Sequence, residues 1–141
     1  CLVGSEMCIR DRAADGNGDE AGIAVMGHDY SALALHRGAA GNELVLYRGK
    51  VTARTAEGVA EEEGVLRLPF AGDTVTLRLY FEDGGTVHYA YELNGQETLL
   101  DGSFPAAKST WSGAKPALFA RNTANRAGGQ GRFGAVSFEC L

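Results

Sequence analysis

Proline, cysteine and tryptophan are scarce in this chain of 141 residues, which contains three prolines, three cysteines and one tryptophan. A basic surplus is also lacking, because 13 lysines and arginines stand against 18 aspartates and glutamates, a net charge of −5 at pH 7. The chain therefore cannot neutralise many phosphates or anionic lipids, and we expect neither nucleic acid nor a membrane as its partner. No apolar run approaches the ~18 residues of a membrane span, and no secretory signal is recognisable. Nothing in the sequence assigns a compartment.

Glycine, in contrast, is abundant. The chain has 20 glycines in 141 residues, about twice the average usage of ~7%. Apolar residues make up 45% of the chain and charged residues 22%, a composition typical of a single globular domain. Many tight turns between short strands would account for the glycine content.

A period of two dominates the chain from Ala21 onward. In the segment Thr74 to Glu82, the residues Val75, Leu77, Leu79 and Phe81 alternate with polar side chains, which predicts a half-buried strand. After Asp83-Gly84-Gly85, a second alternation runs from Val87 to Leu93 and ends at Asn94-Gly95. These turn residues tolerate positive φ angles, so two successive hairpins are predicted.

Further short apolar or alternating runs are separated by glycines, and they occur at Ile23 to Met26, Ala32 to Leu35, Leu44 to Tyr47, Val65 to Phe70, Ala117 to Ala120 and Phe133 to Phe138. No window of ~11 residues carries an apolar stripe at helical spacing. We therefore predict an all-β fold, an antiparallel β-sandwich or jelly roll. The best helix candidate, Thr55 to Glu63, is interrupted by Gly58, and we expect its acidic end, Glu61-Glu62-Glu63, to be a solvated loop.

Motifs for catalysis are weak. The run Gly129 to Gly134 satisfies G-x-G-x-x-G, but a dinucleotide site needs a helix and a second strand after the motif, and seven residues follow it. We interpret it as a glycine-rich loop that enters a last strand. The three histidines, His28, His36 and His88, lack metal-ligand spacing, and we expect them on the surface. No nucleophile motif is present, so we predict no catalytic residues, no metal site and no cofactor.

Trp111 is the one tryptophan, and it lies in the small, polar run Lys108 to Lys115. A tryptophan in a loop can offer its flat face to a sugar ring or to a partner surface. It can equally fold over the edge of the sandwich as part of the core, and the usual burial of large aromatics favours that interpretation.

The first twelve residues, CLVGSEMCIRDR, differ from the rest of the chain. They show no strand alternation, and all twelve resemble the translation of a short-read sequencing adapter found at the ends of metagenomic reading frames. We therefore interpret residues 1–12 as an adapter-derived artefact and expect them to bury little. Residues 13–141 then form the domain. Cys1 and Cys8 lie in the excluded segment, and Cys140 alone supports neither a disulfide framework nor a thiolate zinc site.

Three stretches together resemble the concanavalin A-like C-terminal domain of glycoside hydrolase family 43, the β-xylosidase and arabinofuranosidase type of enzyme. They are Ala21 to Tyr30 with Leu33 and Leu35, then Thr74 to Leu79 with Tyr89, Tyr91 and Asn94-Gly95, and finally Trp111 to Lys115 with Leu118-Phe119-Ala120. The resemblance runs from about Ala21 to Phe138, and the three stretches have an order and spacing similar to those of the family.

This resemblance implies an accessory domain that contains no catalytic carboxylates. In such enzymes these belong to an N-terminal five-bladed propeller, which is the implied partner together with a xylo- or arabino-oligosaccharide. The family's domain sends a loop towards the propeller's pocket, and Trp111 matches the aromatic that helps to close it, which favours the sugar-contacting role. The complete domain is longer, so residues 13–141 are expected to lack its first strands. Around the last strand, Arg132, Gly134 and Ala135 depart from the family's pattern, and no role is carried over there.

Two alternatives remain open at this point. A free-standing carbohydrate-binding module would present a row of aromatics, for which Tyr30, Tyr80 and Trp111 are the candidates. A purely structural cap on the propeller would bury its aromatics and bind no sugar.

Overall fold

The computed structural model describes residues 2–10, 18–51, 60–108, 113–124 and 130–139, and these parts of the chain form strands joined by turns, with no helix. Consequently no helix in the described ranges is long and apolar enough to cross a membrane. The strands are β1 (Leu2–Arg10), β2 (Asp19–Met26), β3 (Asp29–Gly38), β4 (Gly41–Val51), β5 (Ala60–Pro69), β6 (Thr74–Glu82), β7 (Thr86–Leu93), β8 (Gln96–Leu99), β9 (Phe104–Pro105), β10 (Lys115–Asn122) and β11 (Gln130–Glu139).

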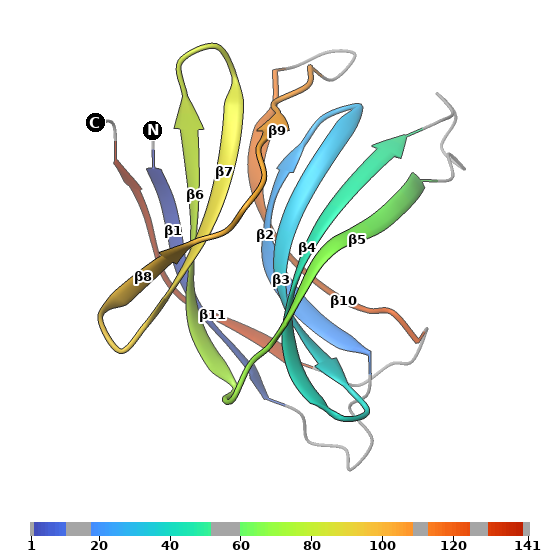
Figure 1. The fold of residues 1–141 in the computed structure, drawn as a ribbon, viewed down its shortest axis with the longest axis vertical. Coiled ribbons are helices and arrows are strands. Elements are labelled where there is room, and N and C mark those ends of the chain that lie inside the picture. The colour runs from blue at the N-terminus through green and yellow to red at the C-terminus, as the bar shows by residue number, and fades with distance from the viewer. Residues whose placement is uncertain (1, 11–17, 52–59, 109–112, 125–129, 140–141) are drawn as a thin grey trace.

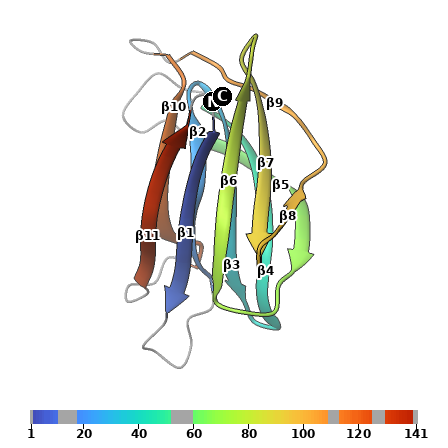
Figure 2. The same cartoon turned by 90° about the vertical axis from the view of Figure 1, so that its left-hand side faces the viewer.

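Two antiparallel sheets pack face to face (Figure 1). Sheet A has the order β11-β1-β6-β7-β8, with β9 also pairing with β7, and sheet B has the order β10-β2-β3-β4-β5. In Figure 2, the strands β11, β1, β6 and β7 lie side by side in front of sheet B. The predicted antiparallel β-sandwich is confirmed.

The core lies between the inner faces of the two sheets. Val75, Leu77 and Leu79 of β6 are at most 2% exposed and face the buried residues Ile23 and Leu33 of sheet B, so the predicted alternation of β6 is confirmed. Polar groups in this core are paired with one another: the hydroxyl groups of Ser31 and Tyr89 lie 2.8 Å apart. Burial raises the pKa of the Tyr89 phenol, which keeps it neutral and able to donate a hydrogen bond.

The two predicted hairpins are also confirmed. Between β6 and β7, Gly84 and Gly85 have φ angles of 93° and 82°. Between β7 and β8, Asn94 and Gly95 have φ angles of 53° and 79°. Two successive residues with positive φ make a turn whose twist matches the flanking strands, and asparagine and glycine are the residues that adopt it at least cost.

The N-terminal segment corrects one expectation. Residues Leu2–Arg10 form β1, which pairs with β11 on one side and, from Leu2 to Cys8, with β6 on the other. We expected no strand here because the segment lacks alternation, but a strand between two others is also held by backbone hydrogen bonds, which any non-proline residue can make. The absence of a strand expected from the missing alternation is therefore wrong. Its resemblance to an adapter translation stays a prediction.

The acidic run Glu61-Glu62-Glu63 corrects another. It was expected to be a solvated loop, but it lies in β5 at the edge of sheet B, paired with Lys50, Gly49 and Arg48 of β4. Charged residues are common on edge strands because they discourage pairing with another chain. The sequence-based argument took the charges as evidence against a strand, whereas here they mark an edge strand.

Candidate functional site

The outer face of sheet B, which points away from sheet A, is unusually well buried. Its floor consists of small buried residues on the inner strands β2 and β3, namely Gly22, Ala24, Ala32 and Ala34. The ring of Phe119 on β10 packs against this floor and would overlap a Cβ on Gly22. Most antiparallel sheets of sandwiches expose their outer face to solvent. Because both faces of β2 and β3 are buried, we take the outer face of sheet B as the candidate functional surface.

A buried carboxylate lies at one end of this face. The Glu20 side chain is 0% exposed and its carboxylate accepts hydrogen bonds from the Tyr47 hydroxyl at 2.6 Å, from His36 Nδ1 at 3.1 Å and from Arg121 Nε. Burial alone raises the pKa of Glu20, but these hydrogen bonds and the charge of Arg121 outweigh it, and the pKa is lowered. Glu20 is therefore ionised and fully partnered, as a buried charge must be.

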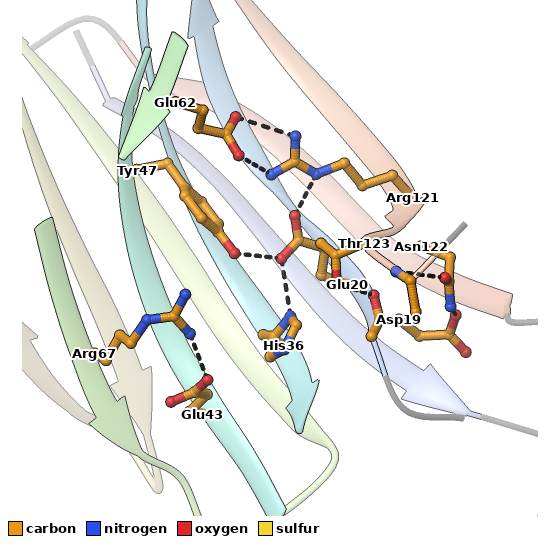
Figure 3. A network of polar contacts seen from close by, with 12 residues as sticks. Asp19, Glu20, His36, Glu43, Tyr47, Glu62, Arg67, Arg121, Asn122 and Thr123 are labelled. Atoms are coloured by element: carbon orange, nitrogen blue, oxygen red, sulfur yellow. Dashed lines mark hydrogen bonds and ion pairs between the residues drawn. The ribbon is translucent and has the colours of Figure 1, made fainter. Parts of the chain in front are cut away.

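Arg121 and Glu62 meet above this face and together join its two edges (Figure 3). The Arg121 guanidinium binds Glu62 through both terminal nitrogens and Glu20 through Nε, and it lies 5.1 Å from the centre of the Tyr47 ring. Arg121 is on β10 and Glu62 on β5, which are the two edge strands of the sheet. On a flat sheet these strands would be about 19 Å apart at a spacing of about 4.8 Å. The two side chains meet because the sheet curves towards this face.

Tyr30, one of the candidate sugar-contacting residues, belongs to the same network. Its hydroxyl donates to Glu62 Oε2 at 2.7 Å, and its ring lies over Gly49, where a Cβ would overlap the ring atoms. Burial, and then the hydrogen bond and charge of Glu62, raise the pKa of Tyr30 to about 12. Gly49 is needed here because an aromatic ring can lie flat only against a backbone without a side chain.

A cleft of about 510 Å³ opens beside Tyr30 at the end of the sandwich. Its walls come from the start of β3, the end of β4, the start of β5 and the short strand β9, and are formed by Asp29, Tyr30, Arg48, Gly49, Lys50, Glu61, Glu62, Glu63, Phe104 and Pro105. Two of its carboxylates face guanidinium groups, since Glu62 is paired with Arg121 and Glu63 with Arg48. Together with Arg48 and Lys50, these carboxylates give the cleft both hydrogen-bond acceptors and donors.

Trp111 lies outside the described residues, and its role stays a prediction. The residues on either side of residues 109–112 are described. The amide of His28 donates to the carbonyl of Lys108 at 3.4 Å, and Lys115 pairs with Met26. Both flanks are thus attached at the turn between β2 and β3, next to the residues of β3 that line the cleft.

Tyr80 lies on the opposite side of the molecule. It is on the outer face of sheet A, beside a second cleft of about 600 Å³ that is also lined by His88, Glu97 and Leu99. Its hydroxyl donates to Glu97, which also binds Arg78 at 3.4 Å. Burial and the hydrogen bond to Glu97 raise the pKa of Tyr80. Because Tyr30 and Tyr80 lie on the outer faces of different sheets, these two tyrosines do not form one aromatic row.

The histidines lie at the surface, and two of them contact carboxylates. The side chain of His36 is 13% exposed and that of His88 is 24% exposed, and each contacts a carboxylate, Glu20 and Glu82 respectively, at 3.1 Å. Both side chains are thus partly exposed, in line with the expected surface position, and each has a carboxylate partner that the sequence did not indicate. Among the residues that the structure describes, no group of three or more histidines, cysteines, aspartates or glutamates is arranged to hold a metal ion.

Sequence reasoning missed the network of Glu20, Tyr47, Glu62 and Arg121. The partners of Arg121 are 101 and 59 residues away in the chain, so no local motif joins them. The one available signal was that Glu20 and Arg121 are charged residues within or beside apolar strand runs. The described part of the G-x-G-x-x-G run, Gln130 to Gly134, lies within β11 itself rather than in a loop that precedes it.

Comparison with known proteins finds the same fold inside larger enzymes. No protein-family profile matches the chain, and no curated protein matches it. Among solved structures, an engineered family 43 glycoside hydrolase with endo-xylanase and exo-arabinofuranosidase activity superposes with a TM-score of 0.67 at 15% identity, over 92% of this chain and 27% of that one. A bifunctional GH43-CE protein of Bacteroides eggerthii superposes with a TM-score of 0.71 at 16% identity, over 94% of this chain and 16% of that one. The resemblance to a β-sandwich of family 43 enzymes is confirmed at the level of the fold.

Proposed function

We propose that this chain is the accessory β-sandwich domain of a family 43 glycoside hydrolase of the β-xylosidase or arabinofuranosidase type. The observation that carries the proposal is the nature of the structural match: nearly the whole chain superposes on about a quarter or less of each neighbour. A fold that occupies one part of a larger enzyme is expected when the reacting groups lie elsewhere in that enzyme.

In this proposal the domain packs on the catalytic propeller and helps to close its sugar pocket. The end of the sandwich that carries the cleft is the surface we assign to this role. It combines Tyr30, held by Glu62, with the attachment points of the segment that contains Trp111. Carboxylates and an oriented phenol bind sugar hydroxyls, and an aromatic ring covers the apolar face of a sugar.

A first experiment tests the absence of chemistry in the chain itself. Purified protein is assayed with an aryl xyloside and an aryl arabinofuranoside. We expect no turnover, because the carboxylate pair required for glycoside hydrolysis is assigned to the propeller. Turnover that is abolished by a single carboxylate substitution within this chain would contradict the accessory role.

A second experiment tests pocket closure. The chain replaces the β-sandwich of a family 43 enzyme, and Trp111→Ala is compared with Trp111→Phe in that fusion. If the indole covers the bound sugar, Trp111→Ala lowers kcat/KM by roughly 10 to 100 fold, with little change in Tm, and Trp111→Phe retains most of the activity. A large loss of Tm with unchanged kinetics would show that Trp111 packs in the sandwich core, where Trp→Ala typically costs ~3 to 5 kcal/mol of stability.

A carbohydrate-binding module is the second candidate function, and the cleft beside Tyr80 favours it. There an aromatic ring, a leucine that is 62% exposed and several hydrogen-bonding groups lie together on one sheet face. Retention of the chain on insoluble xylan, lost in Tyr80→Ala and kept in Tyr30→Ala, would support this candidate. If insoluble xylan retains neither the original chain nor either variant, this candidate is excluded.

A further inference from the structure

The outer edge of β11 differs from the other sheet edges. Edge strands in stable proteins are protected by charges, prolines, bulges or short length. The strand β8 has four residues, β5 carries the three glutamates and a bulge opposite β4, and β10 carries Lys115, Pro116 and Arg121. None of these three edges is open along its whole length.

In contrast, β11 is a ten-residue strand with two charged residues and no proline. On its outer side, no strand among the described residues pairs with it, and β1 occupies its inner side. In Figure 2 it lies at the outer edge of sheet A. Two apolar residues of this strand, Val136 and Phe138, are 41% and 64% exposed. Such a strand is a template for pairing with another strand.

The pairing partners within sheet A show which way these side chains point. Phe133 and Phe138 are aligned through β1 with Val75 and Leu79, which face the core. By the same registers, Arg132 and Glu139 occupy the row that faces outwards. Phe133 and Phe138 are five positions apart, an odd separation that would place them on opposite faces of a regular strand. They share a face because the pairing register of β1 and β11 shifts between Ser5 and Met7.

The sequence of β11 is complementary to itself in the antiparallel direction. When two copies are aligned about a two-fold axis between Ala135 and Val136, Arg132 lies opposite Glu139 of the second copy. In the same alignment, Phe133 lies opposite Phe138. Opposite residues of paired strands share a face, and the observed rows satisfy this condition, with the charges on the outer face and the aromatic rings on the core face.

We propose that β11 pairs with β11 of a second copy of this chain, so that sheet A continues across a two-fold axis into its copy. Each interface contains two Arg132 to Glu139 pairs and two contacts between Phe133 and Phe138, as required by an isologous contact. Each exposed Phe138 ring is covered by the Phe133 ring of the other copy, an aromatic pair that adds to the area buried.

The test is sedimentation equilibrium of the full chain over a roughly thousandfold range of concentration, up to about 1 mM. We expect a monomer–dimer equilibrium. Arg132→Glu and Glu139→Arg each raise the dimer Kd by about tenfold or more, because each dimer contains the pair twice. The double variant Arg132→Glu/Glu139→Arg restores the original Kd. Phe138→Lys abolishes the dimer, while Leu99→Lys, at a similarly exposed position on β8, leaves it unchanged.

Circular dichroism spectra identical to that of the original chain show that the variants fold. A monomer at every concentration would overturn the proposal, as would a dimer that tolerates Phe138→Lys. Failure of the double charge reversal to restore the Kd would exclude the proposed register. Leu118 is a large exposed apolar residue of β10, and loss of the dimer in Leu118→Lys alone would place the contact on sheet B and would also overturn the proposal.

Discussion

Replacing Glu20 by glutamine should destabilise the domain far more than the same change at a surface glutamate. The amide has nearly the same shape, but it loses the negative charge and presents hydrogen-bond donors where the carboxylate accepted from Tyr47, His36 and Arg121. Losing a charge-assisted hydrogen bond and leaving a buried donor unpaired each cost about 1 to 3 kcal/mol. Arg121 keeps its ion pair with Glu62 and is 39% exposed. We therefore expect Glu20→Gln to lower the free energy of unfolding by about 3 kcal/mol, the lower part of the range for a broken buried ion pair.

Urea unfolding followed by circular dichroism measures this loss, and it corresponds to roughly 6 to 12 °C in Tm for a domain of this size. Glu63→Gln is the matched control. Glu63 is also paired with an arginine, Arg48, but the two side chains are 67% and 62% exposed, and exposed pairs contribute about 0 to 1 kcal/mol. Equal losses in Glu20→Gln and Glu63→Gln would refute the argument that burial makes the Glu20 network important. A double-mutant cycle with Arg121→Met should show a coupling energy of about 1 to 3 kcal/mol.

The pH dependence provides a further check of the same prediction. The folded pKa of Glu20 is lowered, so its contribution is fully present above the ordinary glutamate pKa of about 4.3 and is lost as the pH falls through the folded value. The difference in stability between the original chain and Glu20→Gln should therefore be constant above about pH 5 and shrink in more acidic solution. A difference that grows on acidification would have the wrong sign.

Three other outcomes are expected. Deleting Leu2–Arg10 should abolish cooperative thermal unfolding, because β6 and β11 would both lose their partner strand; an unchanged melt would show that β1 is dispensable. Gly49→Ala should cost about 1 to 3 kcal/mol by displacing the Tyr30 ring, whereas Gly113→Ala, whose Cβ would meet no atom of the described residues within 4 Å, should be nearly neutral in the same urea titration. The pKa of Tyr30, about 12, makes its contribution to stability complete below pH 10 and lost as the pH rises towards 12; tyrosinate absorbance should show that Glu62→Gln lowers this pKa, and an unchanged titration would contradict the hydrogen bond.

Much of the sandwich could be predicted because its signals are local. The alternation in β6 follows from one buried and one solvated face, and the two hairpins follow from residues that accept positive φ. The apolar run in β3 was also recognised as a strand, and its lack of alternation is explained by the burial of both faces from Ser31 to Leu35. These features depend on residues within a few positions of one another.

The features that could not be predicted depend on distant partners. Arg121 meets Glu62 because sheet B is curved, and curvature is a property of five strands together rather than of any one segment. Similarly, β1 exists as a strand because β6 and β11 flank it, and Glu61, Glu62 and Glu63 form a strand because β4 pairs with them. In each case the deciding interaction is a backbone or side-chain contact across the sheet, which no spacing along the chain records.

The burial of both faces of β3 has a consequence for how the domain opens. Its backbone is paired on both sides, with β2 and β4, and its residues from Ser31 to Leu35 are at most 4% exposed. Amide hydrogens in such a strand exchange with solvent only when the whole domain unfolds. By contrast, every residue of β8 is exposed, so its amides should exchange through local fraying. Hydrogen exchange would thus place the last-opening part of the molecule in the middle of sheet B and the first-opening part at the far edge of sheet A.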